Sequence, residues 1–140
     1  MAKFKVVIFG RDNDPMTHER AELGDLDCEI VQANPKSEGE AMEIVKDADA
    51  IMGGSFWQND RVINAADKCQ VLAVYSHGFN HVDVDACTNK GIIVTNGAGM
   101  CAEEVSNQAV AFLLALNRQI PWLNSRLKGG TWDAGPFRPK

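Results

Sequence analysis

Three short loops of the sequence combine glycine with small polar residues, and each directly follows an apolar run: residues 53–56, 76–80 and 96–99. Glycine at such a place leaves backbone N–H groups accessible, and neighbouring N–H groups can bind a small carboxylate. Ser76, His77 and Gly78 form the most informative loop, because they follow the clearest buried-strand pattern in the chain. A tight turn between a strand and a helix explains the same residues, so both interpretations stay open.

Residues 97–102 match the glycine pattern of a dinucleotide-binding loop. A true loop of this kind is followed, about 20 residues later, by a strand that ends in Asp or Glu and binds the ribose. Here that region has a helical pattern and then continues with Pro121, Trp122 and Leu123. We therefore expect no phosphate site at residues 97–102.

Other reactive residue types lack partners in the sequence. His77 and His81 are four residues apart, but Gly78 and Asn80 favour a loop and no third ligand is close, so we expect no metal site. The four cysteines include no Cys-x-x-Cys motif, which indicates reduced and mostly buried thiols. Cys101 opens a predicted helix without a nearby His or Asp, so we interpret it as a packed thiol rather than a nucleophile.

The elements that position these residues follow an alternating pattern. Short runs rich in Val and Ile alternate with stretches of helical period, which is typical of strand–helix units around a parallel sheet. We predict five strands, at residues 3–9, 28–31, 50–52, 71–75 and 92–94. In an open parallel sheet, ligands bind beyond the carboxyl ends of the strands, so the three glycine loops should share one edge.

Local signals place the helices between these strands. A helix is expected near residues 17–23, and Ser37 with Glu40 forms a capping box at the start of the next. Asp60 is expected to cap a helix that runs through Ala66, and Gly91 suits the left-handed position after a fourth helix. A long helix at 101–119, apolar almost all round between 109 and 116, is expected to stop at Pro121.

Composition limits the function classes. The chain has 140 residues, a net charge of −5, 45% hydrophobic and 24% charged residues, which is typical of an ordinary globular protein. The Lys and Arg residues are scattered, so no nucleic-acid surface is expected. No segment has the pattern of a signal peptide or a membrane span, which predicts a cytoplasmic protein without a membrane partner.

A phospho-receiver domain has the same five-unit architecture and makes a specific prediction. It needs a phosphoacceptor Asp after the third strand and a Lys after the fifth. This sequence has Gly53, Gly54 and Ser55 at the first place and Thr95 and Asn96 at the second. We therefore reject this alternative.

Several segments together resemble the D-isomer-specific 2-hydroxyacid dehydrogenases. They are VLAVYSHGFNHVDVD at 71–85, GIIVTN at 91–96, CAEEVSNQA at 101–109, LLALNR at 113–118 and KGGTWD at 128–133. Their order and spacing follow the family, strongly from Val71 onward and weakly before about Ala48. No single segment is decisive, but the succession is specific.

The resemblance implies a fold and a division of the chain. Residues 1–98 would form a flavodoxin-like substrate-binding domain, an α/β fold with a five-stranded parallel sheet and helices on both faces. Residues 99–140 would form a long interdomain helix and the start of a nucleotide-binding Rossmann domain. The family's catalytic Arg, its acid and its His come from that second domain, so none is expected in this chain. We therefore expect the chain to be a fragment of a longer enzyme.

The resemblance also implies site residues. The main chain of Ser76, His77 and Gly78 would bind the substrate carboxylate, in agreement with the pattern of the loop itself. Ser55 and Phe56 would flank the substrate side chain. Val105 would lie behind the nicotinamide ring of the cofactor.

The expected activity of the longer protein is hydride transfer between NAD or NADP and a small 2-keto or 2-hydroxy acid. The isolated chain is expected to bind no cofactor, and to form a homodimer that can involve the helix at 101–119. Two departures bring in an alternative: Gly97 and Ala98 replace a common Thr-Pro, and Asn107 and Gln108 replace an acid and a His. The alternative is a corepressor-like member of the family that binds NAD for regulation without significant turnover.

Overall fold

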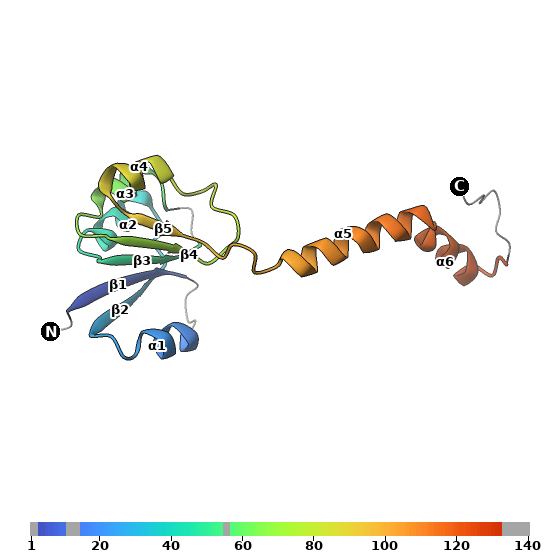
Figure 1. The fold of residues 1–140 in the computed structure, drawn as a ribbon, viewed down its shortest axis with the longest axis horizontal. Helices are drawn as coiled ribbons and strands as arrows, with labels where there is room; N and C mark the ends of the chain where they lie inside the picture. Colours follow the sequence, from blue (N-terminus) through green and yellow to red (C-terminus); the bar gives the residue numbers. More distant parts are fainter. Residues whose placement is uncertain (1–2, 11–14, 55–56, 133–140) are drawn as a thin grey trace. The chain divides into compact units, whose positions relative to one another are not determined.

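The computed structural model describes residues 3–10, 15–54 and 57–132, which form two compact units, residues 1–98 and 99–140 (Figure 1). The elements are β1 (Phe4–Phe9), α1 (Thr17–Leu23), β2 (Cys28–Ala33), α2 (Glu38–Val45), β3 (Ala50–Gly53), α3 (Asp60–Ala65), β4 (Val71–Val74), α4 (Val84–Lys90), β5 (Ile93–Thr95), α5 (Ala102–Asn117) and α6 (Ile120–Lys128). Among the described residues, all strands lie in the first unit.

The strands of the first unit form one parallel sheet in the order β2-β1-β3-β4-β5. The register pairs Val7 of β1 with Val31 of β2 and with Ile51 of β3. This strand order is that of flavodoxin-like folds, so the predicted fold class is confirmed. Because all five strands run in the same direction, their carboxyl ends lie at one edge of the sheet.

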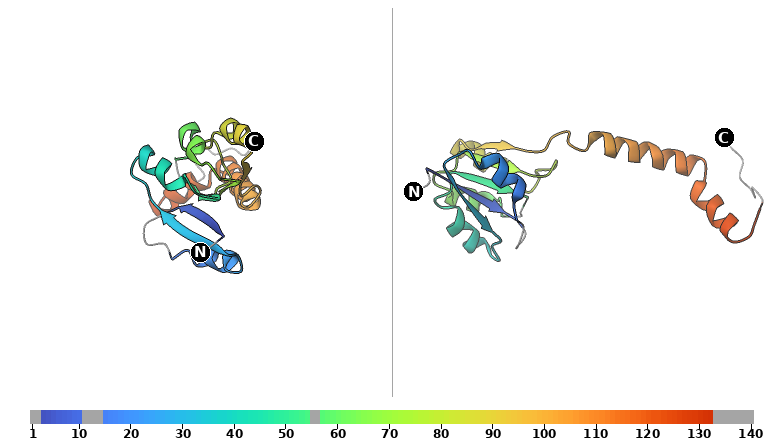
Figure 2. Two further views of the ribbon diagram at one scale, coloured as in Figure 1. Left: turned by 90° about the vertical axis from the view of Figure 1, so that its left-hand side faces the viewer. Right: turned by 90° about the horizontal axis from the view of Figure 1, so that it is seen from below.

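Helices cover the two faces of this sheet unequally. Helices α2, α3 and α4 lie on one face, where Val7, Ile51 and Leu72 are almost completely buried (Figure 1). Helix α1 lies on the other face against β1 and β2, around Val6 and Ile8 (Figure 2). Beside α1, the second face has an open apolar hollow of about 290 Å³, with a lining that includes Phe4, Leu26, Cys28, Met52 and Ala73.

The cap of α3 and one capping contact of α2 differ from the sequence prediction. Asn59, not Asp60, caps α3, because its side-chain oxygen accepts a hydrogen bond from the Val62 N–H at 3.2 Å. At α2, Ser37 accepts from the Glu40 N–H at 3.3 Å as predicted. The Glu40 carboxylate, however, accepts from the Lys36 N–H at 2.8 Å, so the reciprocal half of the predicted capping box is made one residue earlier.

The second unit, residues 99–140, contains α5 and α6. The long helix ends earlier than predicted, at Asn117, because Gln119 takes a left-handed conformation with φ of 52°. Pro121 does not stop that helix but lies in the first turn of α6, where its missing N–H costs no hydrogen bond. In α6 the Arg126 guanidinium stacks 4.8 Å from the centre of the Trp122 ring.

The surface of α5 is apolar and exposed, and no residue of this helix is buried. The exposed large apolar side chains of this helix are Val105, Val110, Phe112, Leu113, Leu114 and Leu116. Within the described ranges, no helix is long and apolar enough to span a membrane.

Candidate carboxylate-binding site

The loop after β4 is held by hydrogen bonds to three consecutive carbonyl oxygens. The Gly97 N–H donates to the Ser76 carbonyl at 3.1 Å, and the Asn96 side-chain amide donates to the His77 carbonyl at 2.7 Å. The Ser76 hydroxyl donates to the Gly78 carbonyl at 2.7 Å. The loop therefore turns its acceptors toward the protein, and residues next to β5 fix its position beside β4.

The N–H groups of Gly78 and Phe79 form no hydrogen bond within the described part of the chain. Both residues are exposed, and a Cβ built on Gly78 has no atom within 4 Å. Two adjacent N–H donors without a partner among the described residues, in an exposed loop at the carboxyl end of a buried strand, suit a small anion such as a carboxylate. Ser76, His77 and Gly78 thus lie in one exposed loop, in which the Gly78 and Phe79 N–H groups remain available.

Gly53 lets the neighbouring strand end close to this loop. Its φ is +124°, and a Cβ at this position would lie 2.1 Å from the Phe9 carbonyl oxygen of β1. Its own carbonyl accepts a hydrogen bond from the Tyr75 N–H, at the end of β4. Ser55 and Phe56, which follow, lie outside the described residues, so their place beside the substrate stays a prediction.

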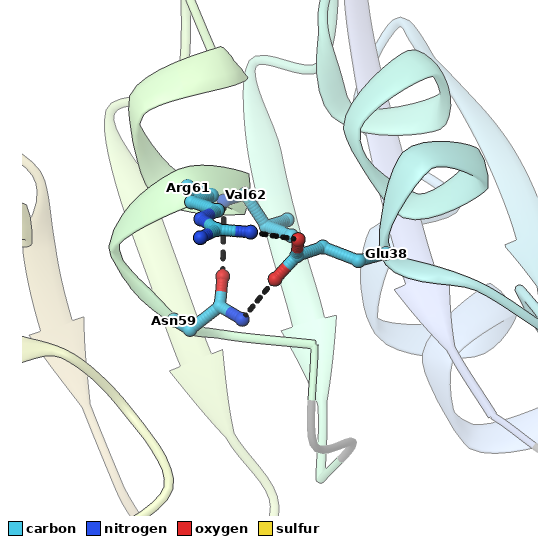
Figure 3. A network of polar contacts seen from close by, with 4 residues as sticks. All are labelled: Glu38, Asn59, Arg61 and Val62. Carbon is cyan, nitrogen blue, oxygen red and sulfur yellow. Dashed lines mark hydrogen bonds and ion pairs between the residues drawn. The ribbon is translucent and has the colours of Figure 1, made fainter.

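A polar network fixes the next part of the β3–α3 loop (Figure 3). The Asn59 side-chain amide donates to Glu38 of α2 at 2.7 Å, and Arg61 pairs with the same carboxylate at 3.1 Å. These hydrogen bonds lower the pKa of the Glu38 carboxyl, and the bond from Asn59 has the largest effect. In the same loop the Trp57 ring N–H donates to the Pro35 carbonyl at 3.1 Å. These contacts thus join the β3–α3 loop and α3 to the β2–α2 loop and α2.

Two backbone donors of residues 97–102 form hydrogen bonds within the protein. The Gly97 N–H donates to the Ser76 carbonyl and the Ala102 N–H to the Gly99 carbonyl, and a bound phosphate would compete with these bonds. The expectation that this segment holds no phosphate stays a prediction. Val105 is exposed on α5 in the second unit, and its predicted place behind the nicotinamide ring stays a prediction.

The cysteines differ in environment. Cys69 and Cys87 are buried, and burial raises the pKa of the Cys87 thiol to about 11. Cys28 is half-buried, whereas Cys101 is exposed, so our interpretation of Cys101 as a packed thiol was wrong. The described residues include no group of three or more His, Cys, Asp and Glu side chains placed to bind a metal.

The sequence did not indicate the structural roles of two polar residues at this edge. Asn96 fixes the His77 carbonyl, and its position directly after a strand was the available signal. Gln58 is only 1% exposed, and neither atom of its side-chain amide has a hydrogen bond partner in the described part of the chain. Its backbone carbonyl accepts from the Asp83 N–H at 2.9 Å, which joins the β3–α3 and β4–α4 loops.

Comparison with known proteins shows the family. Residues 6–120 match the model of the D-isomer specific 2-hydroxyacid dehydrogenase catalytic domain. The chain is 32% identical over 126 residues to D-3-phosphoglycerate dehydrogenase of Methanocaldococcus jannaschii, covering 89% of this chain and 24% of that protein. It is 32% identical over 106 residues to glyoxylate reductase of Thermofilum pendens, covering 75% of this chain and 31% of that protein. The chain therefore belongs to the D-isomer specific 2-hydroxyacid dehydrogenase family.

Solved structures share the fold at lower sequence identity. D-lactate dehydrogenase of Aquifex aeolicus, complexed with NAD and lactic acid, matches with a TM-score of 0.71 and 22% identity, over 94% of this chain and 40% of that one. A glyoxylate reductase of Paecilomyes thermophila matches with a TM-score of 0.76 and 15% identity, over 99% of this chain and 45% of that one. The chain spans about a quarter to a third of the length of the two relatives matched by sequence.

Proposed function

We propose that the complete polypeptide containing this chain is an oxidoreductase that transfers a hydride between NAD or NADP and a small 2-keto or 2-hydroxy acid. Within that protein, the role of this chain is to bind the substrate carboxylate through the Gly78 and Phe79 N–H groups, in the loop that begins at Ser76. The observation that carries the proposal is that the protein engages the loop's carbonyl oxygens, while these two N–H donors form no hydrogen bond within the described residues. Family membership supports the reaction class.

The loop contributes to the reaction by positioning. Two N–H donors fix the carboxylate, so the neighbouring keto carbon has a defined orientation relative to the rest of the site. Backbone donors serve well here because Asn96 and Gly97 hold the loop before the substrate arrives, so that little ordering cost remains for binding. We propose that the hydride donor and the proton donor are held by residues outside this chain.

Turnover by the complete polypeptide tests this proposal. Purified protein is mixed with NADH or NADPH and with glyoxylate, pyruvate or hydroxypyruvate, and the loss of nucleotide absorbance is measured. We expect reduction of at least one of these 2-keto acids. Tight NADH binding without turnover of any 2-keto acid would contradict an enzymatic role and support the regulatory alternative.

We also propose that the protein pairs with a second copy through α5. Its exposed Phe112, Leu113 and Leu116 form an apolar surface that a second copy can cover. We place the protein in the cytoplasm, where the reducing environment keeps cysteines free, as all four are here.

A further inference from the structure

An apolar hollow of about 210 Å³ lies beside the proposed carboxylate-binding loop. Its lining consists of Phe79, Val84, Val94, Thr95 and Asn96. Phe79 belongs to both features, because its N–H is one of the two proposed carboxylate donors and the residue also lines the hollow. Asn96 also belongs to both, because it lines the hollow and its amide fixes the His77 carbonyl. The hollow therefore lies next to the loop that would hold the substrate.

The size and lining of this hollow favour a hydrocarbon group. A cavity of roughly 150 Å³ with aliphatic and aromatic walls accommodates benzene, so the volume here is sufficient for a branched aliphatic chain or a phenyl ring. Phe79 and Val84 are partly exposed, which means that a bound apolar group would remove their surface from water as well as its own.

These loops offer a phosphorylated side chain no Lys or Arg. A second hollow of about 430 Å³ shares Val84 with the first, and its lining includes the carboxylates of Asp83 and Asp85. Neither lining contains Lys or Arg, and the sequence has none at residues 53–60 or 75–85. Taking a phosphate dianion out of water without a cation, next to two carboxylates, is unfavourable.

We propose that the substrate is a 2-keto acid with an uncharged apolar side chain, which enters the hollow formed by Phe79, Val84 and Val94. This assignment rests on the proposed function and narrows its substrate class. It distinguishes this protein from the relative named D-3-phosphoglycerate dehydrogenase, whose substrate by that name carries a phosphate.

Kinetics of the complete polypeptide test the preference. Initial rates are measured with 4-methyl-2-oxopentanoate, phenylpyruvate, glyoxylate and phosphohydroxypyruvate. We expect kcat/KM for one of the two apolar substrates to exceed that for phosphohydroxypyruvate at least tenfold. In a Val94→Phe variant, which fills the hollow, the ratio of kcat/KM for that substrate to kcat/KM for glyoxylate should fall at least tenfold.

Ile93→Phe is the matched control. Ile93 is the preceding residue of β5, it is exposed, and it does not line the hollow. The substrate ratio should stay within twofold in this variant. A similar fall of the ratio in both variants, or a preference for phosphohydroxypyruvate, would overturn the assignment while leaving the proposed reaction intact.

A binding measurement separates the assignment from the reaction. Methyl NMR spectra of the polypeptide are recorded during titration with 4-methyl-2-oxopentanoate and, separately, with phosphoglycolate. Shifts of the Val84 and Val94 methyl signals with the first ligand alone support the hollow as its site, even if no 2-keto acid is reduced and the proposed function fails. Unchanged Val84 and Val94 signals overturn the assignment, whatever the enzyme turns over.

Discussion

Gly53 allows β3 and β1 to end side by side at the edge that carries the proposed site. An alanine here would place its Cβ 2.1 Å from the Phe9 carbonyl oxygen and would hold an unfavourable φ of +124°. Strained backbone alone costs on the order of 1–3 kcal/mol, so Gly53→Ala should lower the free energy of unfolding by at least about 2 kcal/mol. Urea denaturation followed by circular dichroism measures this change.

Gly54→Ala is the matched control for Gly53→Ala. Its Cβ would meet no atom within 4 Å, and its φ lies outside the left-handed region. We expect its free energy of unfolding to stay within about 0.5 kcal/mol of the parent chain. Equal losses in the two variants would show that the close approach of Phe9 and Gly53 is not what requires glycine.

The cysteines should differ strongly in reactivity toward an alkylating reagent. Thiolates react and thiols do not, and burial keeps the pKa of Cys87 at about 11, far above neutral pH. Burial also raises the pKa of Cys69. After brief treatment with iodoacetamide at pH 7.5, peptide mass spectrometry should find Cys101 modified and Cys69 and Cys87 largely unmodified. Complete modification of all three at equal rates in folded protein would contradict the described burial.

At the residue scale, the sequence indicated the carboxylate loop because a glycine directly after a Val-rich strand is a local feature. It did not indicate that Asn96 holds the His77 carbonyl, since this contact joins residues 19 positions apart. Such a contact depends on β4 and β5 being neighbours and on their register, which pairs Ala73 with Thr95. The exposure of Cys101 was likewise not readable from its place at a helix start.

At the scale of the element, Asn59 makes the clearest prediction. It caps α3 through the Val62 N–H and joins this helix to Glu38 of α2. Loss of a cap residue typically costs about 0.5–2 kcal/mol, so Asn59→Ala should lower the free energy of unfolding by about 1–2 kcal/mol. Thermal and urea denaturation both measure this loss.

Asp60→Ala serves as the control, because Asp60 is exposed and is not the N-cap residue. This substitution should lower the free energy of unfolding by less than about 0.5 kcal/mol, because it removes only one acidic side chain from the first turn of a helix. A larger loss with Asp60→Ala than with Asn59→Ala would support the original sequence prediction and contradict the described cap.

The existence of each strand and helix in residues 1–98 was predictable, whereas several ends were not. Strand periodicity and Gly91 located β4 and α4 closely, because both signals are local. The start of α3 was ambiguous, since Asn59 and Asp60 are both good cap residues and only the backbone geometry selects one. Pro121 was misinterpreted because proline occurs both after the end of a helix and in its first turn. Here the left-handed conformation of Gln119 ends α5, so Pro121 lies in the first turn of α6.

At the scale of the whole molecule, exposed apolar surface determines association. The apolar side chains of α5 remain exposed, and each one removed from water contributes roughly 1.5–3 kcal/mol. We expect the 140-residue chain to self-associate through this helix. Sedimentation velocity is measured at protein concentrations from about 5 to about 200 µM, a range that covers the dissociation constants of weak dimers. The weight-average mass should rise with protein concentration.

Leu113→Glu should raise the dissociation constant of this self-association at least tenfold, because it places a charge in the apolar surface of α5. Gln108→Glu is the control, since it introduces the same side chain at a position of α5 that is already polar. A monomer at all concentrations for the unmodified chain, or equal effects of the two substitutions, would contradict association through α5.

We propose that the loop after β4 binds the substrate carboxylate. Gly78→Val in the complete polypeptide tests it most directly, because a Cβ at Gly78 meets no protein atom and the variant should therefore fold. A branched side chain would restrict the loop and crowd the space in front of its N–H groups. The measurement is kcat/KM for a 2-keto acid, together with the Kd of NADH. We predict a fall in kcat/KM of at least tenfold with the NADH Kd within twofold, whereas an unchanged kcat/KM would contradict the account.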